Sequence, residues 1–178
     1  DAVFPPPMRS LLLHGIALVA LGACSACAVE PTPRPDPQRL AGEIAAFSKR
    51  EPVKGGIVFA GSSSIRMWPH LKQDFPGLPV VNHGFGGSVT NDLIVYFDPV
   101  VAREEPKLLV IYSGNDLDKN LRVEEAFDDY TRFIDMARER FPKLRVIVNS
   151  VKIAASRAGE IPRVHELNER LEAWAADR

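Results

Sequence analysis

The chain has 178 residues, a formal net charge of −1 and a hydrophobic content of 46%. These values are typical of one globular domain and exclude a disordered or highly charged segment. The nearly balanced charge leaves no basic stripe of the kind that neutralises phosphates, so we predict that nucleic acid is not a partner.

The first 23 residues have the pattern of a leader and export signal. Met8-Arg9 is followed by LLLHGIALVALGA, a basic start and a short apolar run that ends in small residues before Cys24. A helix that spans a bilayer needs roughly 18 or more apolar residues, and this run is shorter. We therefore predict an exported protein.

Cys24 is the predicted point of attachment to the cell envelope. The stretch Leu21-Gly22-Ala23-Cys24 resembles the lipobox of bacterial lipoproteins, which implies a lipid on the Cys24 sulfur and a periplasmic or outer-membrane location. The alternative is a disulfide with Cys27, but that bridge would close a very small loop and stabilise little. The prolines of VEPTPRPDPQ favour an extended tether, so we assign residues 24–37 to the anchor and tether and 38–178 to the folded domain.

Short apolar runs in the domain alternate with longer amphipathic segments. Residues 39–49 have apolar side chains at helical spacing. Runs at 57–60, 78–81, 108–112 and 146–148 are continuous and apolar, as in buried parallel strands.

Two amphipathic segments in the second half of the domain predict long helices. In residues 123–141, apolar side chains form one face, and the other carries Glu124, Glu125, Asp128, Asp129 and Arg132. Residues 162–176 form the last predicted helix, with Trp174 in its apolar stripe. The order of elements predicts a three-layer, doubly wound, mostly parallel α/β sheet of the flavodoxin-like type.

Three predicted strands end in loops of small and polar residues, at 61–64, 82–88 and 113–116. Such loops are commonly plain turns. The carboxyl ends of parallel strands meet at one edge of the sheet, however, and active sites of doubly wound proteins lie there. The cluster is therefore typical either of a site for a small anion or of a nucleophile beside an oxyanion hole.

Other motifs for such loops do not fit. The segment at 84–89 lacks the third spaced glycine of a dinucleotide fingerprint, and no lysine follows a glycine loop as in a phosphate-binding loop. Ile65 stands where the nucleophile elbow of α/β-hydrolases has its second glycine. No metal-ligand cluster is visible in the sequence, so we predict that no cofactor is required.

Together the three loops resemble the SGNH, or GDSL-type, hydrolases, a family of esterases, lipases, thioesterases and carbohydrate deacetylases. Gly61-Ser62-Ser63 is similar to the first block of the family, with Ser in place of Asp, and the resemblance implies that Ser63 is the nucleophile. The second block implies Gly87 as an oxyanion donor, with Gly86 as the alternative. Ser113-Gly114-Asn115-Asp116 keeps the Gly-Asn-Asp core of the third block, which implies Asn115 as the side-chain donor.

The general base that the family takes from a Asp-x-x-His motif is absent from residues 120–178. His165 lies on a polar helix face, His70 is expected to be exposed, and His83 is close enough to the glycine loop to line the site. We expect that the chain lacks the last strand, helix and base of the family and is nearly inactive as it stands.

The resemblance implies a serine ester hydrolase that forms an acyl-enzyme and acts on a small ester or an acylated carbohydrate. A second hypothesis is a non-catalytic, lipid-anchored binding protein that uses the same fold and loops. An Asp-x-x-His motif downstream of Arg178 would distinguish the two.

Overall fold

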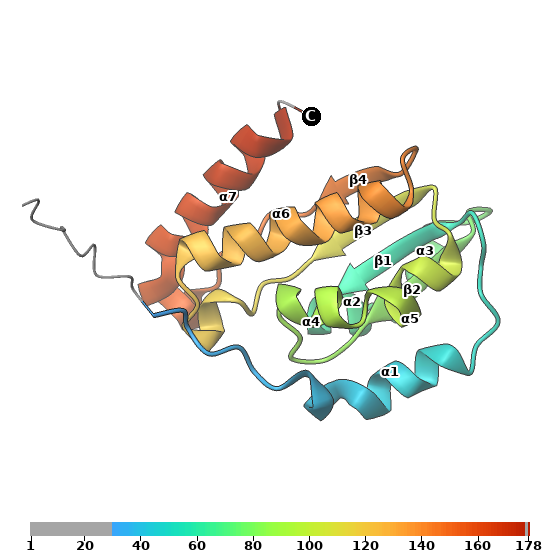
Figure 1. Ribbon diagram of the computed structural model, residues 1–178, viewed down its shortest axis with the longest axis horizontal. Coiled ribbons are helices and arrows are strands. Elements are labelled where there is room, and N and C mark those ends of the chain that lie inside the picture. The colour runs from blue at the N-terminus through green and yellow to red at the C-terminus, as the bar shows by residue number, and fades with distance from the viewer. Residues whose placement is uncertain (1–29, 177) are drawn as a thin grey trace, which may run out of the picture. The chain divides into compact units, whose positions relative to one another are not determined.

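The computed structural model describes residues 30–176 and residue 178, and Figure 1 shows the arrangement of its elements. Pro31–Arg178 forms one unit built on four parallel strands in the order β2-β1-β3-β4. The strands are β1 Ile57–Gly61, β2 Val80–Gly84, β3 Leu108–Tyr112 and β4 Arg145–Val148. The predicted α/β fold with a parallel sheet is confirmed.

Strand β2 begins two residues later than the sequence pattern predicts. Leu78 is 51% exposed, and the proline that follows it has no N–H to donate to a neighbouring strand. The other three strands fall within one residue of the predicted runs, and β1 pairs on one side with β2 and on the other with β3.

Helices cover the two faces of the sheet unequally. Alternate strand residues, such as Val58 and Ile111, belong to a large core, whereas Phe59 and Val110 belong to a small one. The large core is completed by α1 Ala41–Ser48, α4 Thr90–Val95, α5 Phe97–Val100, α6 Val123–Arg140 and α7 Ile161–Ala176. The small core uses the single turns α2 Ser63–Arg66 and α3 Leu71–Asp74. Short 3-10 turns lie at Pro37–Leu40, Ala102–Glu104, Leu117–Lys119 and Ala155–Glu160.

The polar face of α6 is partly buried. Glu125 and Asp129 are each only 6% exposed. Glu125 accepts a hydrogen bond from the Thr32 amide at 2.7 Å, and Asp129 pairs with Arg34 at 3.1 Å. The extended segment before α1, residues 31–36, therefore packs on this face and is called the strap here.

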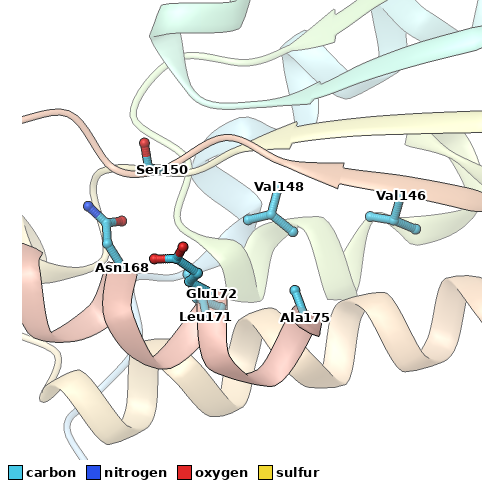
Figure 2. A pocket seen from close by; sticks show the side chains of 7 residues that line it. All are labelled: Val146, Val148, Ser150, Asn168, Leu171, Glu172 and Ala175. Atoms are coloured by element: carbon cyan, nitrogen blue, oxygen red, sulfur yellow. The ribbon is translucent and has the colours of Figure 1, made fainter. Parts of the chain in front are cut away.

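Strand β4 lies at the edge of the sheet, and within the described part of the chain no strand pairs with its outer side. Val146 and Val148 face a groove of about 380 Å³ between β4 and α7, seen from close by in Figure 2. Leu171 and Ala175 line the α7 side of that groove. On the opposite face Ile147 is 46% exposed, so β4 presents apolar side chains on both faces.

The predicted export signal and Cys24 lie outside the described residues. Among those that the structure describes, no helix combines the length and the apolar character that crossing a bilayer demands.

Candidate active site

The three predicted loops start side by side, because backbone hydrogen bonds continue past the ends of the paired strands. The Ser62 amide donates to the Tyr112 carbonyl at 3.0 Å, and the Phe85 amide donates to the Gly61 carbonyl at 2.9 Å. The first loop is thus fixed between the other two at the carboxyl edge of the sheet.

The close approach of β1 and β3 requires glycine at position 61. Its φ is +140°, and a Cβ placed on it would lie 1.8 Å from the Tyr112 carbonyl oxygen. Glycine is also required at position 84, since a Cβ there would lie 2.2 Å from the Arg66 amide nitrogen at the end of α2. Gly61 thus lets β1 approach the end of β3, and Gly84 lets α2 lie directly against the end of β2.

The three serines of the first loop differ in exposure, and Ser63 and Ser64 are both partly exposed. Ser62 is 1% exposed and caps α2, whereas Ser63 begins this helical turn and is partly exposed. The amide of a first helical residue has no acceptor within its helix. The Ser63 hydroxyl and its own N–H therefore both lie at the start of α2.

The glycine turn of the second loop favours Gly87 over Gly86 as a donor. The Gly86 amide already donates to Glu43 Oε2 at 3.1 Å. Gly87 has φ +71°, which favours glycine, and it is exposed. Within residues 30–176 its amide has no hydrogen-bond partner, so this N–H is available to a ligand.

Asn115 connects the third loop to the second. Its side-chain amide donates to the Ser88 carbonyl at 2.9 Å, and Asn115 remains partly exposed. A carboxamide NH₂ has two hydrogens, so one remains for a ligand after this bond is made. The structure thus brings Asn115 to the glycine loop directly.

Asp116 is buried beneath these loops and joins them. Its carboxylate accepts bonds from the Thr90 amide at 2.9 Å, the Thr90 hydroxyl at 3.1 Å and the Ser113 hydroxyl at 2.8 Å. Burial raises the pKa of Asp116 to about 6, although these hydrogen bonds act in the opposite direction. In the sequence Asp116 is visible only as part of the Gly-Asn-Asp motif, and an acidic residue in the loop after a buried strand is the available signal for its role.

Tyr130 supports the start of the same loop from α6. Its hydroxyl donates to the Ser113 carbonyl and accepts from the Ser113 amide at 2.9 Å. The side chain is fully buried, and burial raises its pKa well above the usual value. Tyr130 looked like an ordinary apolar member of the helix stripe in the sequence, which carries no signal for this role.

His83 does not line the site, so that expectation is wrong. Its ring stacks on Phe47 at 4.6 Å, and its Nδ1 lies 2.6 Å from the Val100 carbonyl oxygen, within the large core. Burial lowers the pKa of His83. The preceding side chain, Asn82, points to the opposite face and bonds the Ile65 carbonyl at 2.7 Å, because successive strand residues alternate between faces.

The other two histidines of the described residues are exposed, as the sequence predicts. His70 Nδ1 is bonded to the Gln73 side chain at 3.0 Å, and His165 lies on the outer face of α7. Within residues 30–176, therefore, no histidine is hydrogen-bonded to the candidate nucleophile.

The fold and the loops define a doubly wound α/β protein with a serine, a glycine turn and an asparagine at the carboxyl edge of its sheet. The model of the GDSL-like lipase/acylhydrolase family matches residues 53–178, more than half of the chain. The chain therefore belongs to this family of SGNH, or GDSL-type, hydrolases, whose members hydrolyse ester bonds. No curated protein matches it.

Solved structures show the same fold. A predicted acylhydrolase from Bacteroides fragilis is 25% identical, with a TM-score of 0.64 over 79% of this chain and 72% of that one. A GDSL-like lipase from Bacteroides thetaiotaomicron is also 25% identical, with a TM-score of 0.63 over 80% and 74%. An acetyl xylan esterase from Geobacillus stearothermophilus, 16% identical with a TM-score of 0.50 over 72% and 75%, shares the fold.

Proposed function

We propose that the protein is a serine ester hydrolase in which Ser63 is the nucleophile. The observation that carries the proposal is the placement of a partly exposed Ser63 beside two loops that hold unoccupied donors, the Gly87 N–H and one N–H of the Asn115 side chain. The Gly87 N–H belongs to the backbone of the glycine turn, and the Asn115 side chain is held by its bond to the Ser88 carbonyl, so both donors are in place before reaction.

In the proposed reaction the Ser63 oxygen attacks the ester carbonyl carbon and gives its proton to a general base. The carbonyl oxygen becomes negative and accepts hydrogen bonds from Gly87 and Asn115. The bond between the carbon and the alcohol oxygen then breaks, the alcohol leaves with the proton, and an acyl group remains on Ser63. Water attacks this acyl-enzyme in the same way and releases the carboxylic acid, which regenerates the serine.

A non-catalytic binding protein is the second candidate, favoured by one observation. None of the histidines in residues 30–176 is hydrogen-bonded to Ser63, so the base is not supplied by His70, His83 or His165 as they are placed. On this alternative the same donors would bind an acyl or carbohydrate ligand without turning it over.

The test is hydrolysis of p-nitrophenyl acetate by the protein expressed from its complete reading frame. We expect Ser63→Ala to abolish turnover, and Asn115→Ala to lower kcat by about 10² to 10³, because it removes one oxyanion donor. Ser64→Ala is the matched control and should retain activity. Equal hydrolysis by the wild type and Ser63→Ala would exclude Ser63 as the nucleophile, and a wild type with no turnover would favour the binding protein.

The substrate class that we propose is a small ester or an acylated carbohydrate. We also propose that the domain is attached to the bacterial cell envelope through a lipid on Cys24, on the basis of the sequence LGAC. Metabolic labelling with a fatty acid, compared between the wild type and Cys24→Ser, tests this attachment.

A further inference from the structure

Two charged side chains from one N-terminal segment reach the glycine turn of the site. The segment is Pro37–Ser48, and it precedes residue 53, at which the family match begins. Glu43 Oε2 accepts the Gly86 amide at 3.1 Å, and Arg39 Nη2 lies 3.3 Å from the Gly87 carbonyl oxygen. Gly86 is thus bonded to a negatively charged side chain, and the next residue, Gly87, to a positively charged one.

Arg39 is itself held in place by a buried carboxylate. Its Nη1 and Nη2 donate to the two oxygens of Asp92 at 3.0 Å and 2.6 Å. Asp92 is fully buried at the start of α4 and also accepts the Val89 amide at 2.8 Å. A bidentate pair fixes the plane of the guanidinium, so the donor that faces Gly87 has a defined direction.

A third charged side chain borders the turn from the side of the nucleophile. A Cβ on Gly86 would lie 2.9 Å from the central guanidinium carbon of Arg66, the last residue of α2. Arg66 Nη1 is 3.8 Å from Glu43 Oε2, so the two charges partly balance each other. The turn therefore lies between α2 and the N-terminal segment.

We propose that Arg39 and Glu43 are positioning residues for the oxyanion donor. They act on the Gly86–Gly87 turn, whose two glycines would otherwise leave the backbone free to change conformation. Glu43 occupies the N–H of Gly86 and Arg39 fixes the carbonyl of Gly87, whereas the Gly87 N–H between them has no partner within residues 30–176 and remains for a ligand. This inference rests on the proposed function, because it assigns the residues to the same oxyanion hole.

The physical reason for an effect on turnover is that an oxyanion donor works only when it is already aligned in the free enzyme. Loss of the Glu43 or the Arg39 contact lets the turn move. The Gly87 N–H is then no longer aligned with the developing negative charge, although the substrate pocket is unchanged. A fall in kcat with an unchanged KM is therefore expected, since the donor acts on the transition state rather than on the bound ester.

The experiment compares four variants in hydrolysis of p-nitrophenyl acetate by the protein expressed from its complete reading frame. We expect Arg39→Met and Glu43→Ala to lower kcat about 10-fold with KM within about twofold, less than the loss for removing a donor outright. Glu43→Gln should retain kcat, because its amide oxygen can still accept the Gly86 N–H. Ile44→Val loosens the packing of the same segment while keeping both contacts with the turn, and it serves as the control for general destabilisation.

The outcomes separate this inference from the proposed function. Full hydrolysis by Ser63→Ala would overturn both. Hydrolysis that is lost in Ser63→Ala but unchanged in Arg39→Met and Glu43→Ala would overturn this inference alone. Equal losses in Glu43→Gln and Glu43→Ala, or in Ile44→Val and Arg39→Met, would also overturn it, because the effect would then follow charge or general stability instead of the contact with the turn.

A second readout does not depend on turnover. Amide hydrogen exchange at Gly86, whose N–H is bonded to Glu43, should be about 10-fold faster in Arg39→Met than in Ile44→Val when followed by NMR, because local opening of the turn exposes this amide. Equal rates in the two variants would show that Arg39 does not hold the turn.

Discussion

Strands β3 and β4 are neighbours with similar apolar sequences, LLVIY and RVIV, yet they differ in burial. The last four residues of β3 are buried, because β1 and β4 flank the strand and helices cover it. In β4, exposed and half-buried residues alternate, since only β3 pairs with it among the described residues. An apolar run therefore predicts a strand, but its burial is decided by what lies on each side.

Truncation of one isoleucine in each strand gives the largest expected contrast. Ile111 is fully buried in the large core, and Ile111→Ala should lower the free energy of unfolding by about 4 kcal/mol, because it removes buried methyl groups and leaves a cavity. Ile147 is 46% exposed, and Ile147→Ala should cost less than about 1 kcal/mol. Urea unfolding measures both, and similar losses would show that β4 is covered in solution.

The loop that follows β3 contains a buried carboxylate, that of Asp116. Burial raises the pKa of Asp116 from the ordinary 3.8 to about 6 in the folded protein. The folded state therefore binds more protons between these values, and the contribution of Asp116 to stability is present below pH 4 and is lost as the pH rises to about 6. The loss is on the order of 3 kcal/mol, from about two pKa units.

Asp116→Asn should remove this pH dependence. We expect the difference in unfolding free energy between the wild type and Asp116→Asn to change by that amount from pH 4 to pH 7, with the wild type relatively more stable at pH 4. Asp128→Asn, at an exposed position on α6, is the control and should leave the profile unchanged. A parallel profile for Asp116→Asn would mean that the carboxyl group has an ordinary pKa.

Local patterns in the sequence are sufficient to predict the helices and strands and to locate the loops of the site. Leu108–Tyr112 is predicted to the residue because it is a continuous apolar run, and Val123–Arg140 differs from its predicted range by one residue because its helical period is clear. The three loops followed from the rule that parallel strands end on one edge. Their backbone bonds confirm that they lie together.

Contacts between distant segments could not be predicted in the same way. Arg39 and Asp92 are 53 positions apart, and neither stands in a recognisable motif. His83 was expected beside the glycine loop on sequence proximity alone, whereas the alternation of β2 turns its ring into the core. Glu125 and Asp129 fall on the polar face of their helix, and nothing in that helix indicates that another segment covers them.

The strap covers the polar face of α6, whereas no strand covers the outer side of β4 within the described residues. Truncating a strap residue should have the smallest of the expected effects on stability. Arg34 is 22% exposed and pairs with Asp129, so Arg34→Ala should lower the free energy of unfolding by about 1 kcal/mol, the upper end for a partly exposed ion pair. Burial already raises the pKa of Asp129, and loss of the opposing guanidinium should raise it further, which NMR titration can measure. Lys152→Ala, at an exposed position, is the control. An unchanged pKa of Asp129 would show that the strap does not cover α6 in solution.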